Sequence, residues 1–403
     1  MNVVFLVANY EPYCDPTTRI AKKCMTYFVN RGDHVSVISI ATINSKLQMV
    51  DEGKNIIAMY NKQEIKEQKN ENYWAVMVSK IRHTLVFPHG FRWYVENAIQ
   101  EIEKLEKELG VDALVAVSAP YAAILVGQRW KCKHPQCRLI NYIVDPYRFT
   151  SKIERLFYGR TFNKIESCAY LAADYNLVFD GIKDSINALP EAKTSILYTQ
   201  IDVGKRYCKR QIHKRIKVQL AYSGGFYYEF RNPSFMMEVL DMLPQNQVEI
   251  HIYSNGSCAD LLDPFYNKSN SVFVKEQWVE HDELQEKLRG MDFLLNISNG
   301  ISGFQPSKLF EYIATGLPII SFYTNGLKEE ILGRYPLSIQ IDCDNESKDE
   351  ALQKIDEFML KNLDKRISPE EIEKLFPMHS KSYFHRTMEC MCESLFDNGE
   401  END

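Results

Sequence analysis

The sequence predicts an α/β protein of two doubly wound, Rossmann-like domains, each a parallel sheet with helices on both faces, facing a common cleft. Three observations lead to this fold class. Short apolar segments alternate with amphipathic segments, as in repeated strand–helix–strand units. The alternation lapses at residues 202–217 and then restarts. The chain has 403 residues, 45% of them apolar and 12% aromatic, which is enough to fill more than one core.

The first half of the chain opens with a buried strand at 2–8. The amphipathic segment 19–32 follows and should form a helix that ends at Gly32. The same pattern then repeats. Further strands are expected at 34–40, 112–120, 138–146 and 174–180, and further helices at 95–111 and 160–173.

The second half repeats this order of elements. Strands are expected at 218–225, 248–254, 291–298 and 317–322, and helices at 233–243 and 281–290. The segment 304–320 reads as a loop, a helix, a Gly-Pro turn and a buried strand. The tail, 369–396, is helical with a break near Pro377. In such sheets, ligands bind at the carboxyl ends of the strands.

The alternation of strands and helices stops at residue 202 and resumes at residue 218, and these two points set the expected domain boundaries. Residues 1–201 form a first domain, 202–217 a basic interdomain linker, 218–376 a second domain, and 377–403 a helical tail that crosses back to the first domain. Seven lysines and arginines crowd the linker. It is either a solvated connector or a contact with anionic lipid or phosphate.

Bulk composition excludes several classes of protein. A net charge of −6 gives no reason to expect a nucleic-acid partner. The ten cysteines are scattered, which indicates free thiols in a reducing compartment. Cys132, His134 and Cys137 lie close together, but no second ligand pair follows at zinc spacing, so we expect no metal.

Targeting signals are also missing from the pattern. The apolar run at residues 2–8 lacks a basic segment before it and reads as a strand rather than a signal peptide. No run approaches the roughly 18 apolar residues of a membrane span. We therefore expect a cytoplasmic protein, with peripheral contact to the inner face of the cell membrane left open.

The two halves of the chain differ in whether glycines follow their first strand. The first loop, at residues 9–19, has no glycine, which argues against a dinucleotide-binding dehydrogenase, and no Walker motif occurs in the chain. In the second half, Gly224 and Gly225 follow a strand, and Arg231 comes six residues later. Glycines let a phosphate approach backbone amides, and arginine binds it in a bidentate manner. The alternative is a tight turn beside a surface arginine.

The segment 304–320 carries the clearest chemistry. Ser307 and Lys308 come at the start of a helix, where free amides and a positive side chain suit an anion. Glu311 lies one turn further on the same face and can accept two hydroxyl hydrogen bonds, as from a ribose. Phosphate and ribose together indicate a nucleoside diphosphate. The alternative is a surface helix with an ion pair between Lys308 and Glu311.

Three segments together resemble the donor domain of GT-B glycosyltransferases. They are GGFYYEFRNPSFMMEVL, DELQEKLRGMDFLLNIS and PSKLFEYIATGLPIISF, which span about 120 residues. The likeness is to the bacterial polysaccharide-assembly branch of the retaining family four. VSAPYAAILVG, IVDPYR and ILYTQID resemble the first domain and the crossing between domains more loosely.

The resemblance implies an enzyme that transfers a sugar from a UDP- or GDP-sugar to a saccharide or polyprenyl-linked saccharide. Its setting would be the synthesis of capsule or another cell-surface polysaccharide, with no cofactor and no metal. Glu311 would be the ribose-binding glutamate, the second of a Glu-x7-Glu pair. Arg231 would bind the diphosphate, and Lys308 would contact phosphate or sugar.

The chain departs from the family pattern in four places. Gly303 stands where the first glutamate of the pair is expected, so retention or inversion stays open. Gly225 replaces a second basic residue, and Ser118 replaces a histidine that faces the transferred sugar. The glycine-rich first loop is replaced by EPYCDPTTR.

Further residues are predicted for catalysis and for acceptor or donor binding. Asp15 is expected to orient the acceptor or act as general base, with Ser118 and Asp145 beside it, although Asp145 before a proline could instead cap a turn. The remaining candidates are Arg19, His89 and Tyr121 for the acceptor and His281 for the donor. For His89 and His281 the alternative is ordinary packing or helix capping.

Two other functions fit the same fold. The first is a non-catalytic partner or scaffold that lost turnover together with the first glutamate. The second is a nucleotide-sugar 2-epimerase, whose paired acidic residues and histidine have no evident counterpart here. The donor sugar, the acceptor and the oligomeric state are not determined by the sequence.

Overall fold

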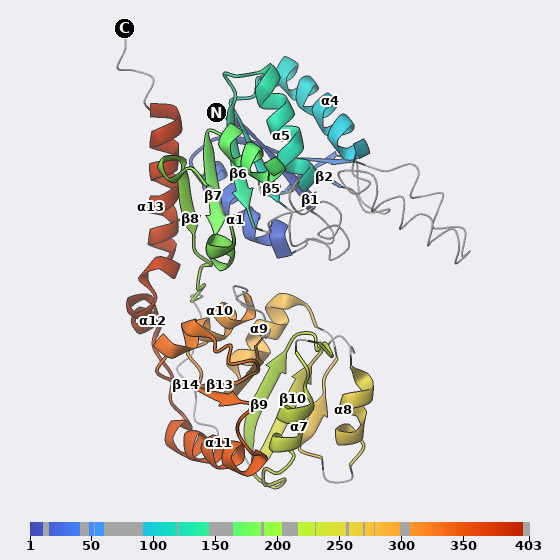
Figure 1. Cartoon of the computed structure of the whole chain (residues 1–403), viewed down its shortest axis with the longest axis vertical. Helices are drawn as coiled ribbons and strands as arrows, with labels where there is room; N and C mark the ends of the chain where they lie inside the picture. The colour runs from blue at the N-terminus through green and yellow to red at the C-terminus, as the bar shows by residue number, and fades with distance from the viewer. Residues whose placement is uncertain are drawn as a thin grey trace, which may run out of the picture. The chain divides into compact units, whose positions relative to one another are not determined.

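The computed structural model shown in Figure 1 describes most of the chain. The described residues are 1–10, 16–40, 48–51, 53–59, 92–118, 121–144, 164–186, 189–203, 217–229, 231–254, 258–268, 271–277, 279–298 and 307–397. The chain divides into two compact units. Unit 1 comprises Met1–Tyr198 and Phe384–Asp403, and unit 2 comprises Thr199–Tyr383. Most of the linker expected at 202–217 lies outside the described residues.

Unit 1 contains an eight-stranded sheet in the order β3-β4-β2-β1-β5-β6-β7-β8. Its strands are β1 (Asn2–Asn9), β2 (His34–Ile40), β3 (Gln48–Asp51), β4 (Lys54–Met59), β5 (Ala113–Ser118), β6 (Arg138–Ile143), β7 (Tyr175–Phe179) and β8 (Thr194–Leu197). All neighbouring pairs are parallel except the edge pair of β3 and β4, which is antiparallel. That edge pair was not expected from the sequence.

Helices cover both faces of this sheet, because side chains of a strand alternate between its two faces. Val3, Phe5 and Val7 of β1 belong to one core, together with residues of α1 (Pro16–Asn30) and α13 (Lys381–Cys392). Val4 and Leu6 belong to a second core, with α4 (Arg92–Leu109) and α5 (Tyr121–Lys133). The C-terminal helix α13 therefore packs within unit 1, beside α1 (Figure 1).

Unit 2 contains a six-stranded parallel sheet in the order β11-β10-β9-β12-β13-β14. Its strands are β9 (Val218–Ser223), β10 (Val248–Tyr253), β11 (Phe273–Lys275), β12 (Phe293–Ile297), β13 (Ile319–Tyr323) and β14 (Ser338–Asp342). The chain leaves β9 in one direction, to β10 and β11, and later continues on the other side, from β12 to β14. The switch point between β9 and β12 is where a ligand is expected.

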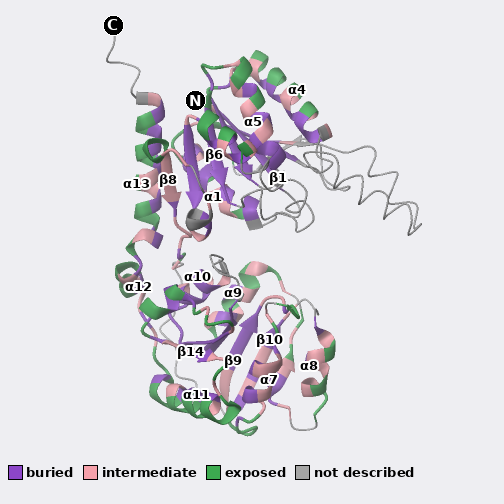
Figure 2. Ribbon diagram, in the orientation of Figure 1, coloured by how far each residue is buried: buried purple, intermediate pink, exposed green. Residues whose placement is uncertain are grey.

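Helices again cover both faces of the sheet of unit 2. One face packs against α7 (Ser234–Leu240), α8 (Ala259–Tyr266) and α11 (Lys348–Asn362). The other face packs against α9 (His281–Arg289), α10 (Ser307–Ala314) and α12 (Pro369–Leu375). Figure 2 shows buried residues concentrated on the strands between these layers. The predicted fold class, two doubly wound α/β units, is confirmed.

Local signals explain where several helices begin and end. Ser347 and Glu350 form a reciprocal capping box at the start of α11. Ser368 accepts a hydrogen bond from the N–H of Glu371 at the start of α12. After α10, Gly316 adopts a φ of +74°, the left-handed conformation that favours glycine at a helix end.

The described helices were compared with the length and hydropathy of a membrane span. Among the described helices, none combines the length and apolar character needed to cross a bilayer.

Candidate functional site

The candidate site of unit 2 lies where the carboxyl end of β9 meets the amino end of α10. Tyr312 of α10 fixes the two elements together. Its hydroxyl oxygen accepts a hydrogen bond from the N–H of Ser223 at 2.8 Å and lies 3.1 Å from the Ser223 Oγ. Lys308 is one turn before Tyr312 on the same helix face. The sequence motif at 304–320 is therefore placed at the switch point of the sheet.

Lys308 is the most unusual side chain of this site. Its Nζ is buried and has no hydrogen-bond partner among the described residues. The nitrogen lies 4.2 Å from the centroid of the Tyr222 ring, and a Cβ at Gly224 would stand 3.9 Å from it. Burial, followed by the charge of Arg231, holds the pKa of Lys308 well below its ordinary value. A ring face alone compensates little of the cost of a buried cation.

Two glycines follow β9, and Gly224 lies beside the Lys308 side chain. Gly224 has a φ of +124°, and its N–H donates to the carbonyl of Tyr253 at 2.9 Å. Gly225 lies against Tyr227, since an added Cβ would be 3.1 Å from the Tyr227 hydroxyl. A larger residue at either position would be strained or would push a side chain aside. The Gly224 N–H is thus already bonded within the sheet, and the approach of a phosphate to the backbone at Gly224 and Gly225 stays a prediction.

Arg231 is positioned by a tight turn. Backbone hydrogen bonds of 3.2 Å and 3.1 Å join Tyr227 and Arg231 across this turn. The side chain of Arg231 is half-buried, and its charge lowers the pKa of Lys308. Arg231 and Lys308 therefore lie close enough for their charges to interact, an arrangement that favours binding of an anion.

Glu311 faces α9 rather than Lys308. The Nε2 of His281 lies 3.2 Å from Glu311 Oε1, and the amide of Gln285 donates to Glu311 Oε2 at 2.8 Å. Helices α9 and α10 lie next to each other at this end of the sheet (Figure 1). The alternative of a simple Lys308–Glu311 surface pair does not describe this arrangement, because each side chain faces different neighbours.

Glu329 supplies a buried carboxyl group near the two cations. It is 7% exposed and follows β13. Its N–H donates to Gln340 Oε1 at 2.8 Å, and its carbonyl accepts from Gln340 Nε2 at 3.2 Å, which fixes the segment to β14. Burial raises the pKa of Glu329 to about 7, against the lowering effect of Lys308 and Arg231.

Glu329→Gln is expected to stabilise the protein more at pH 8 than at pH 5. The pKa of Glu329 is about 7 in the folded protein and 4.5 ordinarily, so the folded state binds more protons in this window and its stability falls as pH rises. At about 1.4 kcal/mol per pKa unit the fall is roughly 3 kcal/mol. Glutamine does not ionise. The advantage of the variant in free energy of unfolding, measured with urea, should therefore grow by about 2–3 kcal/mol over this range.

Lys308 contributes to stability with the opposite slope. Its pKa is lowered, so the folded protein binds fewer protons than the unfolded one, and this contribution rises with pH up to the ordinary value of 10.5. Wild type and Glu329→Gln both contain Lys308. Most of its pH dependence therefore cancels when their free energies of unfolding are subtracted. The neighbouring, exposed Glu330 provides the matched control variant, Glu330→Gln. A pH-independent difference for Glu329→Gln would show that this carboxyl stays ionised.

The catalytic and acceptor candidates of unit 1 have less distinctive surroundings. Ser118, at the end of β5, is buried and accepts a hydrogen bond from the N–H of Val144 at 3.2 Å. Tyr121 is buried in a core, and burial, followed by Glu166 and Cys168, raises its pKa. Arg19 is exposed on α1. These three stay predictions.

For several other predicted site residues the structure describes no side chain. Asp15, His89, Asp145 and Gly303 lie outside the described residues, and Ser307 begins α10 with a side chain that is not described. His281 begins α9 and is the one donor-site histidine placed beside Glu311. The structure thus brings together Gly224, Gly225, Arg231, Lys308, Glu311 and His281 in unit 2.

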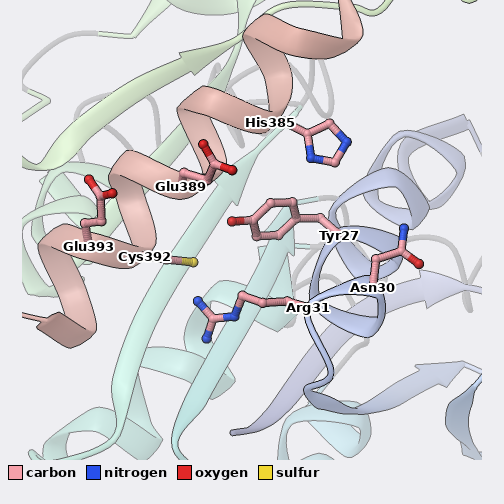
Figure 3. A pocket seen from close by; sticks show the side chains of 7 residues that line it. All are labelled: Tyr27, Asn30, Arg31, His385, Glu389, Cys392 and Glu393. Atoms are coloured by element: carbon pink, nitrogen blue, oxygen red, sulfur yellow. The ribbon is translucent and has the colours of Figure 1, made fainter.

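A pocket of about 350 Å³ opens elsewhere, between α1 and α13 of unit 1 (Figure 3). Tyr27, Arg31, His385 and Glu389 are among its lining residues. Burial raises the pKa of Tyr27 to about 12, and Arg31 is held by Asp33 at 2.7 Å. Its lining contains none of the predicted site residues, and its mixed charge selects no particular ligand.

Metal ligation finds no support within the described part of the chain. There, no group of three or more His, Cys, Asp or Glu side chains is arranged to hold a metal ion. His134, between the two cysteines of the zinc-like segment, stacks on Trp130 with ring centroids 3.8 Å apart. That histidine therefore has a packing role.

Sequence reasoning missed two residues of the site, Gln285 and Glu329. For Gln285 a signal existed, because it lies four residues after His281 and hence on the same face of α9. For Glu329 we find no local signal. Its neighbour Glu330 has the same side chain and is exposed, so only burial distinguishes them.

Comparison with known proteins supports the fold. No family model matches the chain, and no curated protein matches it. Among solved structures, a glycosyltransferase from Rickettsia africae ESF-5 gives a TM-score of 0.61 at 13% identity, over 98% of this chain and 99% of that chain. The apo lipopolysaccharide outer core galactosyltransferase WaaB gives 0.59 at 13% identity, over 99% and 100%.

Two further matches show how widely this fold is used. A trehalose-6-phosphate structure from E. coli bound with UDP-2-fluoro glucose gives a TM-score of 0.59 at 12% identity, over 98% of this chain and 99% of that chain. A putative UDP-N-acetylglucosamine 2-epimerase from Listeria monocytogenes gives 0.53 at 10% identity, over 100% and 98%. At such low identity the likeness concerns architecture alone. The chain has the GT-B fold, as the resemblance of its second half predicted.

Proposed function

We propose that the protein is a glycosyltransferase that uses a nucleoside-diphosphate sugar as donor. UDP- and GDP-sugars are the donor classes that fit. The proposed donor site is the set of residues around the amino end of α10 in unit 2. The fold agrees with this activity without requiring it, so the proposal depends on the site.

The buried Nζ of Lys308 is the observation that carries the proposal. A buried ammonium without a hydrogen-bond partner among the described residues lowers stability, and an anion bound beside it would remove that cost. The neighbouring Arg231 and the amino end of α10, where backbone N–H groups of a helix point outward, favour the same charge. A diphosphate, with two to three negative charges, matches this need better than a single carboxylate.

Glu311 lies on the adjacent face of the same helix and suits a different part of the donor. A carboxylate accepts hydrogen bonds from two neighbouring hydroxyl groups, as a ribose offers. One turn of helix thus presents a phosphate-binding cation and a hydroxyl-binding anion. That combination selects a nucleoside diphosphate over inorganic phosphate or a free sugar.

The chemistry follows from these charges. The acceptor hydroxyl oxygen forms a bond to the anomeric carbon of the donor sugar, and the bond from that carbon to the diphosphate oxygen breaks. The diphosphate leaves with one more negative charge. Protonated Lys308, Arg231 and the helix amides stabilise that charge, which is usually the largest contribution of a catalytic site. The hydroxyl proton passes to a base, for which Asp15 is our candidate.

The finer parts of the proposal come from the resemblance. We expect a saccharide or polyprenyl-linked saccharide acceptor and a role in building a cell-surface polysaccharide, at the inner face of the membrane. We also expect transfer without a metal and with retention of configuration, although Gly303 replaces a glutamate of the family pattern. Arg19, His89, Ser118, Tyr121 and Asp145 are the remaining acceptor-side candidates.

Calorimetric titration with UDP and GDP, and with their common sugar derivatives, tests the donor site. The wild-type protein should bind at least one of these nucleotides. Glu311→Ala should weaken that binding about 100-fold, since two hydrogen bonds to a charged group are lost at about 1.5 kcal/mol each. Gly303→Glu should retain binding. Exposed Glu283, which pairs with Lys287 on the surface of α9, provides the control variant Glu283→Ala.

Product analysis separates the three functions. Transfer, or slow hydrolysis of the donor to free sugar, supports the glycosyltransferase. Conversion of a nucleotide sugar to its 2-epimer without an acceptor would support the epimerase instead. A folded wild-type protein that binds no nucleotide would favour the scaffold and contradict the proposal.

A further inference from the structure

The carboxylate of Glu311 is held by two residues of a single helix. His281 and Gln285 are four residues apart on α9, so both face the same direction. His281 Nε2 lies 3.2 Å from one carboxylate oxygen, and the Gln285 amide donates to the other at 2.8 Å. The orientation of the carboxylate group is therefore restrained at both of its oxygens.

The two contacts differ in their environment. Gln285 is 9% exposed, and its hydrogen bond to Glu311 is partly buried. The side chain of His281 is 41% exposed at the first turn of α9. The Glu311 side chain is 35% exposed, which leaves part of the carboxylate accessible to a ligand. The bond from Gln285, which is shorter than the His281 contact and comes from a buried side chain, is the one suited to fix the plane of the carboxylate.

We propose that Gln285 is a positioning residue for Glu311, and that it makes the site selective for ribonucleoside over 2′-deoxyribonucleoside diphosphates. This inference rests on the proposed function. Each carboxylate oxygen can accept two hydrogen bonds. Each oxygen has one contact with α9, so each can accept one more hydrogen bond from a ligand hydroxyl. A carboxylate held in this plane accepts both hydroxyls of a vicinal diol at once.

Loss of the Gln285 donor should affect the two kinds of ligand differently. A carboxylate that only His281 still contacts can rotate about that contact, and it accepts one hydroxyl in many orientations, as a 2′-deoxyribose requires. The carboxylate accepts two hydroxyls only in one orientation. Because Gln285 holds the Glu311 side chain in that orientation before the ligand binds, binding costs no further side-chain entropy. Selectivity against the deoxy ligand also arises because the second oxygen would remain without a hydroxyl partner. The variant should therefore lose affinity for the ribonucleotide and little for the deoxyribonucleotide.

The test is calorimetric titration of the full chain with UDP, 2′-deoxy-UDP, GDP and 2′-deoxy-GDP. For the preferred base, wild type should bind the ribonucleotide about tenfold or more tightly than its deoxy form. Gln285→Met keeps the volume and removes the donor. It should reduce the ratio to about threefold or less, through weaker binding of the ribonucleotide. An unchanged ratio in this variant would overturn the inference, because a purely structural role would weaken both ligands alike.

Gln353 of α11 provides a matched control. Its amide also donates to a glutamate, Glu357 Oε1 at 2.9 Å, but on the exposed surface. Gln353→Met should leave the ratio unchanged. Should Gln285→Met fail to fold, Gln285→Glu keeps the side-chain size and replaces the donor by a like charge, and it should also abolish the preference.

Outcomes for wild type separate this inference from the proposal beneath it. Wild-type protein that binds ribonucleotide and deoxyribonucleotide equally would overturn the role of Gln285 and leave the donor site intact. Wild-type protein that binds none of the four would overturn both.

Discussion

Lys308→Met is expected to abolish nucleotide binding and, at the same time, to stabilise the unliganded protein. The Lys308 Nζ is buried over the Tyr222 ring at 4.2 Å without a hydrogen-bond partner among the described residues. Methionine keeps the length of the side chain and removes the buried polar group. Affinity for UDP or GDP should fall at least about 100-fold, since charge-assisted bonds to phosphate are lost. The free energy of unfolding should rise by about 1–2 kcal/mol.

The two effects are measured separately, by calorimetric titration and by thermal unfolding. A gain of this size corresponds to a rise in Tm of about 2–8 °C for a unit of this length. Exposed Lys328, whose Nζ lies 5.5 Å from the Tyr323 ring centroid, provides the control. Lys328→Met should change neither quantity. A Lys308→Met variant that binds nucleotide normally would show that this lysine is not the anion ligand.

Gly316→Ala should have the largest effect on stability. The residue has a φ of +74°, and a Cβ there would lie 2.3 Å from the carbonyl oxygen of Ile367. That oxygen belongs to backbone that is itself held by the bond from Ile367 N–H to Gly316 O at 2.9 Å. We expect a loss of roughly 3–5 kcal/mol, from the left-handed conformation and from the forced backbone shift. Because Gly316 follows α10, Lys308 and Glu311 should move, and nucleotide binding should weaken.

Gly326 separates the two causes of this loss. It has a φ of +67°, but no atom lies within 4 Å of an added Cβ. Gly326→Ala should therefore cost only about 1 kcal/mol. Urea denaturation of both variants gives the comparison. Equal losses for the two variants would mean that the clash with Ile367 is relieved by a small, inexpensive movement.

The elements that could be predicted have a strong pattern of their own. Strand β1 contains a continuous apolar run, β9 and β12 are mainly apolar, and α1, α4 and α9 have helical periodicity, so local sequence was sufficient. Helix α11 was missed although Ser347 and Glu350 form a capping box that could have revealed it. The short strands β3, β11 and β14 were missed for another reason. All three lie at sheet edges, and burial in β11 and β14 is only partial, so their apolar pattern is weak.

The candidate site shows the same division. The order of residues places Lys308 and Glu311 one turn apart at the start of a helix, and it places two glycines after a strand. Those facts follow from helical geometry and turn chemistry, which are local. The sequence could not tell that Glu311 faces Gln285, because α9 and α10 are separate in the chain and meet only through the sheet.

By itself, then, the sequence determined the two α/β halves and the motif that supplies cation and carboxylate. Only the tertiary structure decided which charged groups lose water. Lys308 and Lys328 are chemically identical, as are Glu329 and Glu330, yet one member of each pair is buried at the site and the other is exposed. The physical reason is that desolvation depends on all the elements packed around a group, whereas its place in a helix or turn depends on its neighbours in the chain.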